Sequence, residues 1–397
     1  MRCFILTTFV TRLRKQHIFM VKNTIKVVKM IRIFSVMFLA AAVLVSCGRG
    51  GNVVVTGTIQ GAKNGTLYLQ HEVDGLYRNV DSVEMKKNGR FELSADVDSP
   101  EVYYLAFGKS APVISFFAEP GTVNVSARID SLSSAKVTGG KNQELYTSFM
   151  EYMRDFASRK NDAYIKILQA SAADGNKDSL QAYSNAYSGL ERRQAQFIAN
   201  FAVTNASYEI APLIAYTFLN KGYSPILDTI KSKMPQNILA SKYGREFSSF
   251  VEQAKNTLVG MKAPQFEMSQ DSLSFSSEDY AGKYMFLVVW AAGDEVNSDY
   301  ITSLKDVYAK WHGKGLEVLS SCISADDQQY GYDTYYLSMP WTEIRDARGV
   351  KNTVAEKFAL TGNLPASVLI APDGTILAKY ITPSDLDKVL AYLQDKK

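Results

Sequence analysis

Cysteine is the most reactive type of side chain in this 397-residue sequence, which contains three: Cys3, Cys47 and Cys322. A thiolate can attack a disulfide, but a second thiol must then release the mixed disulfide, so thiol exchange needs a pair. An internal structural disulfide also needs two partners. The chemistry open to this protein therefore depends on which cysteines remain in its working form.

The beginning of the chain has the layout of an export signal, with basic residues before an apolar run over 33–45. That run is short for a membrane span. It ends in Leu44-Val45-Ser46-Cys47, which resembles the lipobox of bacterial lipoproteins, where cleavage leaves a lipidated cysteine at the new N-terminus. The sequence thus predicts a lipoprotein-type signal peptide over 1–46, lipidation of Cys47 and a flexible tether over 47–51.

The alternative to a lipoprotein signal is an N-terminal membrane helix with a chance cysteine. Residues 1–19 contain nothing typical of a signal, so Met20 and Met30 stay open as translation starts beside Met1. The eight basic residues before Cys47 have no acidic counterpart, which leaves 36 Lys and Arg against 40 Asp and Glu in the remainder. That formal charge of −4 and the lack of a basic run disfavour a nucleic-acid partner.

If lipid consumes Cys47, Cys322 has no partner. It falls in the apolar run 316–323, which predicts a buried core thiol rather than the exposed, electropositive thiolate of a peroxidatic site. The sequence also lacks a Pro-x-x-x-Thr-x-x-Cys arrangement and any Cys/His cluster, so we expect no metal and no cofactor.

Hydrophobic periodicity divides the remaining chain into three regions. Short strand-like runs separated by Asn-Gly and Pro-Gly turns predict an antiparallel sandwich or barrel over 52–138. Apolar residues at helical spacing predict a helical region over 143–257. Alternating strands and helices over 261–397 begin with the continuous apolar run 284–290, as expected of a buried parallel strand. The expected class is an α+β multidomain chain with a β domain, a helical spacer and a C-terminal α/β domain.

Several phrases of the C-terminal region resemble thioredoxin-like envelope proteins of the TlpA/ResA type. They are Lys262-Ala263-Pro264-Gln265-Phe266, Gly282-Lys283-Tyr284, the segment 290–297 and Gly362-Asn363-Leu364-Pro365. The resemblance implies a thioredoxin fold over 261–397 and a cis proline at Pro365. The region 52–138 resembles the β domain of unknown function that often precedes such domains in Gram-negative envelope lipoproteins.

Within that resemblance, the two cysteines of the family's Cys-x-x-Cys motif correspond to Asp294 and Asn297. Neither side chain can exchange disulfides. The motif lies at a helix N-terminus, where Asp294 is expected to act as an N-cap. Its alternative, a catalytic carboxylate, lacks a nearby histidine, because His71 and His312 lie elsewhere.

The resemblance also implies a cleft beside the proline loop. There the backbone of Leu364 would pair with an extended peptide, while Trp290 and Pro365 would form an apolar wall. For Trp290 the alternative is a core aromatic residue.

We therefore expect a lipid-anchored cell-envelope protein, placed at the outer membrane and facing the periplasm, with a redox-inactive thioredoxin-like domain that binds or scaffolds an extended peptide or protein. A homodimer stays open. The alternatives are a thiol-disulfide oxidoreductase or antioxidant-type enzyme acting through an atypical site, and a purely structural envelope component without a ligand cleft. Fold by itself does not decide among them.

Overall fold

A computed structural model describes residues 51–62, 64–73, 76–108, 113–172, 177–270, 273–324 and 326–395. The predicted signal peptide and Cys47 lie outside the described residues. The chain divides into two compact units, one ending at Ile214 and also containing Lys233–Gly244, the other made of Ala215–Ser232 and Arg245–Lys397. The helices expected over 143–257 are thus shared between both units.

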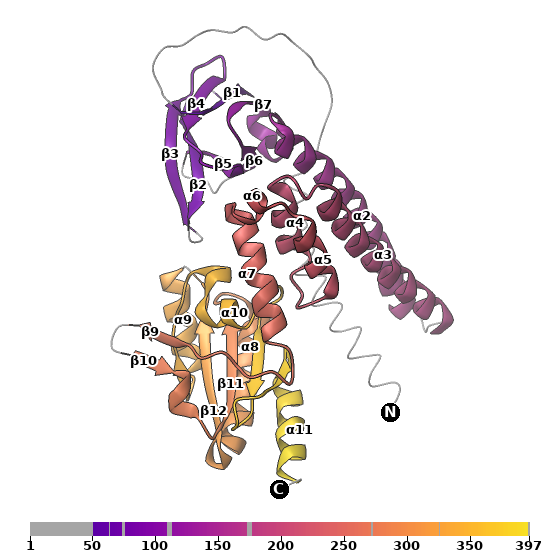
Figure 1. Cartoon of the computed structure of the whole chain (residues 1–397), viewed down its shortest axis with the longest axis vertical. Helices are drawn as coiled ribbons and strands as arrows, with labels where there is room; N and C mark the ends of the chain where they lie inside the picture. Colours follow the sequence, from indigo (N-terminus) through magenta and orange to yellow (C-terminus); the bar gives the residue numbers. More distant parts are fainter. Residues whose placement is uncertain are drawn as a thin grey trace. The chain divides into compact units, whose positions relative to one another are not determined.

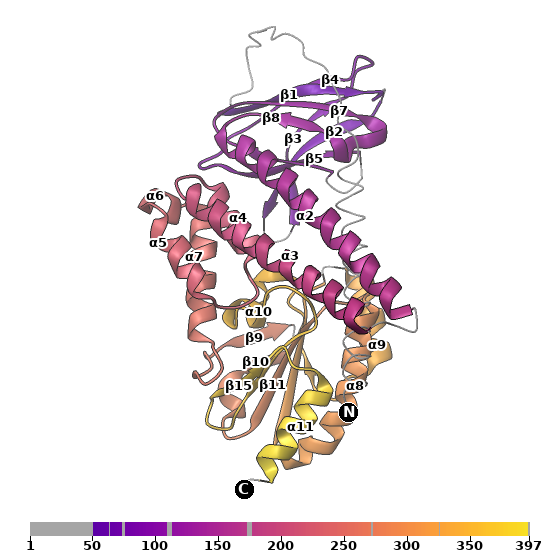
Figure 2. The same ribbon diagram turned by 90° about the vertical axis from the view of Figure 1, so that its right-hand side faces the viewer.

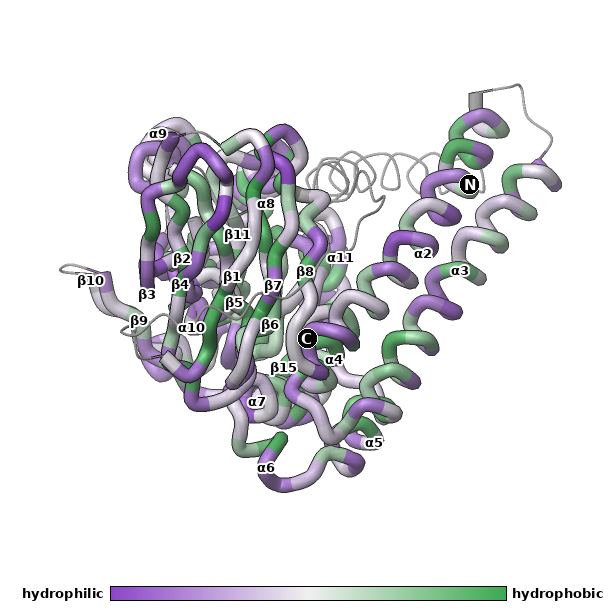
Figure 3. Tube along the Cα trace, turned by 90° about the horizontal axis from the view of Figure 1, so that it is seen from above, coloured by the Kyte–Doolittle hydropathy of each residue, from purple (hydrophilic) through white to green (hydrophobic). Residues whose placement is uncertain are grey.

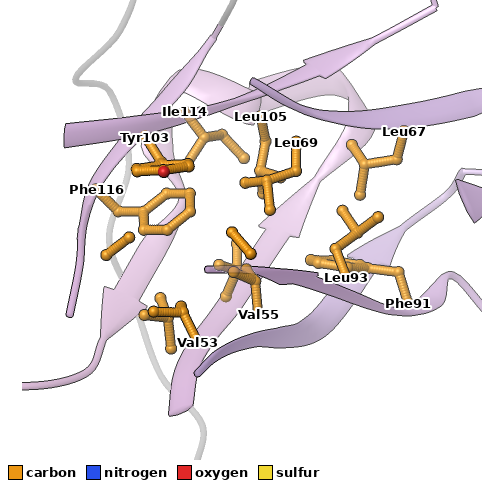
Figure 4. Packing of buried hydrophobic residues seen from close by; sticks show 14 of the residues in the cluster. Val53, Val55, Leu67, Leu69, Phe91, Leu93, Tyr103, Leu105, Ile114 and Phe116 are labelled. Atoms are coloured by element: carbon orange, nitrogen blue, oxygen red, sulfur yellow. The ribbon is translucent and has the colours of Figure 1, made fainter. Parts of the chain in front are cut away.

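The described residues of the first unit begin with two four-stranded sheets, ordered β4-β1-β7-β8 and β3-β2-β5-β6. Neighbouring strands are antiparallel except β1 and β7, which are parallel. Alternate residues of both sheets point toward one another and form a common core (Figure 4). The strands are β1 (Val53–Gln60), β2 (Thr66–Val73), β3 (Leu76–Glu84), β4 (Arg90–Ala95), β5 (Glu101–Phe107), β6 (Ile114–Ala118), β7 (Gly121–Arg128) and β8 (Lys136–Thr138).

A turn glycine shows how closely these strands approach. Gly89 has a φ of +67°, and a Cβ placed there would lie 2.2 Å from the carbonyl oxygen of Ile59. Both the left-handed backbone and the close approach require glycine. The Asn88-Gly89 pair is therefore a turn, as the sequence predicts.

The helices follow the β-sandwich. The long helices α2 and α3 lie side by side (Figures 1 and 2), and the ring of Phe149 packs against those of Phe197 and Phe201. Polar and apolar stretches alternate along both helices (Figure 3), as amphipathic packing requires. The helices after the sandwich are α2 (Lys141–Ala172), α3 (Lys177–Thr204), α4 (Ile210–Phe218), α5 (Pro225–Lys233), α6 (Gln236–Leu239) and α7 (Lys242–Asn256). The short 3₁₀ helix η1 (Ile129–Ser134) lies between β7 and β8.

The C-terminal region contains a five-stranded sheet ordered β13-β12-β11-β14-β15. Strand β11 pairs in parallel with β12 (Figure 1). Its other neighbour is β14, with which it pairs antiparallel. The elements are β9 (Glu267–Gln270), β10 (Leu273–Ser276), η2 (Ser277–Tyr280), β11 (Tyr284–Trp290), α8 (Glu295–Trp311), η3 (His312–Lys314), β12 (Leu316–Cys322), α9 (Asp327–Leu337), β13 (Thr342–Glu343), η4 (Gly349–Lys351), α10 (Thr353–Lys357), β14 (Ala366–Ile370), β15 (Ile376–Lys379) and α11 (Pro383–Gln394).

Strand β11 is buried on both faces. Its odd-numbered residues from Met285 to Val289 pack with Phe358 and other residues at α10, whereas Phe286, Val288 and Trp290 pack with α8 and α11. This two-sided burial explains why the strand reads as a continuous apolar run. The predicted α+β class, with a β domain, helices and a thioredoxin-like α/β domain, is confirmed.

None of the helices in the described part of the chain combines the length and the apolar character that crossing a bilayer would require.

Candidate functional site

The turn between β11 and α8 carries the two positions where the sequence predicts lost cysteines. Asp294 is the N-cap of α8, and its Oδ1 accepts a hydrogen bond from the backbone N–H of Asn297 at 3.0 Å. This satisfies one of the amides that a helix N-terminus leaves free. The expected N-cap role of Asp294 is confirmed.

The side chains of these residues are also joined. Nδ2 of Asn297 donates to Oδ1 of Asp294 at 2.9 Å, and Oδ1 of Asn297 accepts from the backbone N–H of Ala291 at 3.1 Å. Asn297 is 3% exposed. The buried side-chain amide of Asn297 therefore links the residue at the start of the turn, Ala291, to the N-cap residue Asp294.

Two further backbone amides of the turn are held by side chains from outside it. Ala292 N–H donates to Oγ of Ser324 at 2.8 Å, and Gly293 N–H donates to Oδ2 of Asp333 at 2.6 Å. The other oxygen of Asp333 accepts from Nε2 of Gln329 at 2.8 Å. Side chains from outside the turn thus occupy two of its amides, in addition to those of Ala291 and Asn297 that side chains within the turn accept from.

Trp290, the last residue of β11, is completely buried. Its indole Nε1 donates to the carboxyl group of Glu343, at 3.1 Å to Oε2 and 3.3 Å to Oε1. The expectation that Trp290 forms the wall of an open cleft is therefore corrected in favour of its alternative, a core aromatic residue. The reason is that β11 is central in the sheet and α8 covers this face of it.

The proline loop lies at the same end of the sheet as the turn. The Leu364-Pro365 peptide is cis, as the family resemblance implies, and β14 starts directly after it, with Ala366 paired to Val289. Leu364 and Pro365 are partly exposed. Among the described residues, Leu364 has no hydrogen-bond partner for its backbone amide or carbonyl. The structure thus leaves this loop free to pair with another strand.

Comparison with known proteins finds similar sequences for two parts of the chain. A family model described as a domain of unknown function (DUF4369) matches residues 53–146. The thiol-disulfide oxidoreductase ResA of Bacillus cereus is 24% identical over 153 residues, which is 37% of this chain and 84% of the relative. ResA of Oceanobacillus iheyensis is 26% identical over 145 residues, 34% of this chain and 72% of the relative. The chain is thus similar to TlpA/ResA-type thioredoxin-like proteins in its C-terminal part and carries a match to DUF4369 in its N-terminal part.

Among solved structures, this chain is similar to the thioredoxin domain of a thiol-disulfide oxidoreductase from Bacteroides vulgatus. It is 20% identical, with a TM-score of 0.31, and the match covers 34% of this chain and 97% of that one. A thioredoxin-like protein from Bacteroides caccae is 17% identical, with a TM-score of 0.36, over 55% of this chain and 84% of that one.

In the thioredoxin-like domain, Cys322 is the free cysteine of the described residues, and it is fully buried. Burial raises the pKa of its thiol, although Ser324 N–H reaches Sγ at 3.5 Å. Both effects of burial, the raised pKa and the lack of access, oppose thiolate chemistry. The predicted buried core thiol is confirmed.

Sequence reasoning missed the carboxyl group beneath the thioredoxin-type turn. Besides the indole of Trp290, Glu343 accepts hydrogen bonds from Oγ of Ser320 and from the backbone N–H of Cys322, the latter at 3.1 Å. Burial raises the pKa of Glu343 to about 7, against the opposing effect of these donors. Ser320 in turn accepts from the indole of Trp341 at 2.8 Å. The signal in the sequence that could have indicated this buried carboxyl group is the segment Trp341-Thr342-Glu343, where an acid lies within a strand-like run.

Proposed function

We propose that the thioredoxin-like domain of this chain is redox-inactive and serves as a binding or scaffolding module. The observation that carries the proposal is the hydrogen bond between Asp294 and Asn297 at the two positions of the dithiol motif. Disulfide exchange requires sulfur at both positions, whereas here a carboxylate and an amide close the turn. The buried Cys322 supports the same conclusion.

The binding role rests on the proline loop. The backbone of Leu364 is unpaired within the described chain, and the adjacent strand β14 is already aligned in the sheet. An extended segment of another protein can add main-chain hydrogen bonds there, while Pro365 offers apolar contact. This mode requires no chemical step.

Placement in the cell envelope follows from the lipobox-like sequence at Cys47. We place the lipid-anchored chain at the outer membrane, facing the periplasm. Labelled fatty acid should be incorporated into the protein in cells. Label taken up equally by a Cys47→Ala variant would contradict the anchor.

The test of redox inactivity is insulin reduction with a dithiol donor. Wild-type protein should show no turnover above buffer. Turnover that disappears in Cys322→Ser would instead establish the alternative, an oxidoreductase acting through an atypical cysteine. Alkylation of the native protein gives an independent measurement, because a buried Cys322 should react slowly with a thiol reagent.

A further inference from the structure

The segment that leads from α10 into the proline loop is held by hydrogen bonds from side chains. The ammonium group of Lys379 donates to the carbonyl of Phe358. Further along, the hydroxyl group of Thr361 donates to the carbonyl of Asn220, which follows α4 and belongs to the same compact unit as the loop. The residues 358–361 are therefore bound both to the end of β15 and to the helical region.

Tyr380, the residue directly after β15, contacts this segment with its hydroxyl group. The hydroxyl oxygen accepts from the backbone N–H of Thr361 at 3.1 Å. Its single proton is within reach of the carbonyls of Ala359 and Thr361, both at 3.3 Å. The backbone N–H of Tyr380 donates to the carbonyl of Ser367 in β14 at 2.8 Å. One residue therefore ties the segment 359–361 to the sheet.

Both partners of this contact have an uncommon backbone conformation. Ala359 has a φ of +47° and Tyr380 a φ of +56°, and among the described residues Ser338 is the one other non-glycine residue with a positive φ. Such a backbone is unfavourable for side chains larger than hydrogen, and it persists where the surrounding structure fixes it. The hydroxyl group of Tyr380 supplies part of that fixation at Ala359.

The hydrogen bonds end where the loop itself begins. Gly362 has a φ of +102°, and a Cβ placed on it would meet nothing within 4 Å. Within the described part of the chain, Gly362, Asn363 and Leu364 have no hydrogen-bond partner. Gly362 and Asn363 are exposed. The boundary between held and free backbone thus lies between Thr361 and Gly362, two residues before Leu364.

We propose that Tyr380 and Thr361 are positioning residues of the loop-binding site, which hold the free backbone of Leu364 in line with β14 for pairing with an extended peptide. A backbone edge that is already in place loses less conformational entropy when a partner strand binds. Neither side chain needs to touch the partner. The inference rests on the binding role proposed above and adds the residues that determine its affinity.

The test attaches an extended peptide beside the loop. The antiparallel register of Val289 with Ala366, continued past both strands, brings Leu364 to the level of Ala291, three residues before Asp294. In the full chain with Asp294→Cys, the introduced thiolate displaces thionitropyridine from an activated peptide disulfide and retains the peptide as a mixed disulfide. The peptide alternates threonine and alanine around one central cysteine. A second peptide has proline on both sides of the cysteine and lacks those N–H donors.

Three substitutions are compared in this background, and mass mapping confirms that the peptide is attached at position 294. Tyr380→Phe removes one hydroxyl group and keeps the ring. Thr361→Val removes the hydrogen bond to Asn220 and keeps the shape of the side chain. The matched control is Tyr300→Phe, which removes a tyrosine hydroxyl that donates to a carbonyl outside the segment 358–361, that of Ile381 at 2.7 Å.

The measurement is hydrogen exchange of the Leu364 amide. With Tyr380 intact, the threonine–alanine peptide should slow this exchange at least about tenfold, whereas the proline peptide should not. Tyr380→Phe and Thr361→Val should each reduce the protection by about five- to tenfold, the effect of losing one hydrogen bond, and Tyr300→Phe should change it by less than about twofold. A purely stabilising role would instead lower protection in all three variants together with their urea midpoints.

Failure of this inference and failure of loop binding give different results. Protection retained in either folded variant, Tyr380→Phe or Thr361→Val, overturns the inference and leaves loop binding intact. An equal loss in Tyr300→Phe also overturns it, because destabilisation of the domain then accounts for the effect. No protection with Tyr380 intact, or equal protection by the proline peptide, refutes strand pairing at Leu364 and the inference with it. If Tyr380→Phe does not fold, Thr361→Val decides.

Discussion

Asp294 and Asn297 face each other across the first turn of α8, where one carboxylate oxygen accepts from both the backbone and the side-chain nitrogen of Asn297. The two distances are 3.0 and 2.9 Å. A dithiol at these positions opens and closes with redox state, but this polar bridge does not. Hydrogen bonds, and no disulfide, join these two positions of the turn.

This bridge should contribute strongly to the stability of the domain. Asn297→Ala leaves the amide of Ala291 without its acceptor and creates a small cavity, so we expect a loss of about 2–3 kcal/mol in unfolding free energy. Ser303→Ala, on the exposed side of α8, is the matched control and should change stability by less than about 0.5 kcal/mol.

Tryptophan fluorescence during urea unfolding makes this measurement selective, because Trp290, Trp311 and Trp341 are the three tryptophans of the chain and all lie in the C-terminal unit. If Asn297→Ala unfolds at the same urea concentration as Ser303→Ala, the bridge is not what holds the turn.

Glu343 should make stability depend on pH. Burial raises its pKa to about 7 in the folded protein, from an ordinary 4.5, so folding favours the protonated form. The stabilisation is fully present below pH 4.5 and is lost as pH rises through 7. Relative to Glu343→Gln, wild type should therefore lose stability between pH 5 and pH 8, by up to about 3 kcal/mol.

The neighbours of Glu343 do not obscure this titration. Burial raises the pKa values of both Tyr330 and Cys322, which keeps them neutral across the window, and Arg345 lies over the Tyr330 ring. Urea unfolding followed by tryptophan fluorescence at each pH gives the comparison. Parallel pH profiles for wild type and Glu343→Gln would show that the carboxyl group titrates normally.

Local sequence patterns were sufficient for much of this domain. The apolar run ending at Trp290 predicts a strand buried on both faces, and Asp294 before a helical period predicts an N-cap; both are present. The cis Leu364-Pro365 peptide followed only from the family resemblance. These features depend on neighbouring residues or on a short phrase.

Hydrogen bonds between residues far apart in the chain could not be predicted from the sequence. Glu343 and Asp333 are ordinary acids by pattern, yet the sheet and α9 bring them to the indole of Trp290 and the amide of Gly293. The family resemblance implies a cleft wall for Trp290, but the exposure of this side chain depends on how α8 packs over the sheet. No period or motif within one segment carries that information.

Lys379 should give stability the opposite response to pH. Its ammonium group donates to the carbonyl of Phe358 and lies 3.4 Å from Oγ1 of Thr257, and burial lowers its pKa to about 8 from 10.5. Folding thus favours the neutral amine, so its stabilisation is lost as pH falls through 8.

Relative to Lys379→Met, wild type should gain stability between pH 7.5 and pH 10. Taking the difference between the two proteins removes the contribution of tyrosines that titrate at higher pH. Unfolding in urea followed by tryptophan fluorescence measures it, and a difference that stays flat over this range would mean that Lys379 remains charged in the folded protein.

The turn between β11 and α8 should support thiol-disulfide exchange when both cysteines of the motif are introduced. Asp294→Cys with Asn297→Cys places two thiols at the first and fourth positions of the motif, on the same side of the first turn of α8. They should close under oxidant. The helix N-terminus should lower the pKa of the first thiol, so insulin reduction should appear. It should be weak, because Glu295 adds a negative charge beside the thiolate and Val296 stands where the family has proline. Asp294→Cys alone is the control, since it lacks the resolving thiol. If mass measurement finds no disulfide in the folded double variant, this segment is not a thioredoxin-type active-site turn, and the proposal of a lost dithiol falls with it.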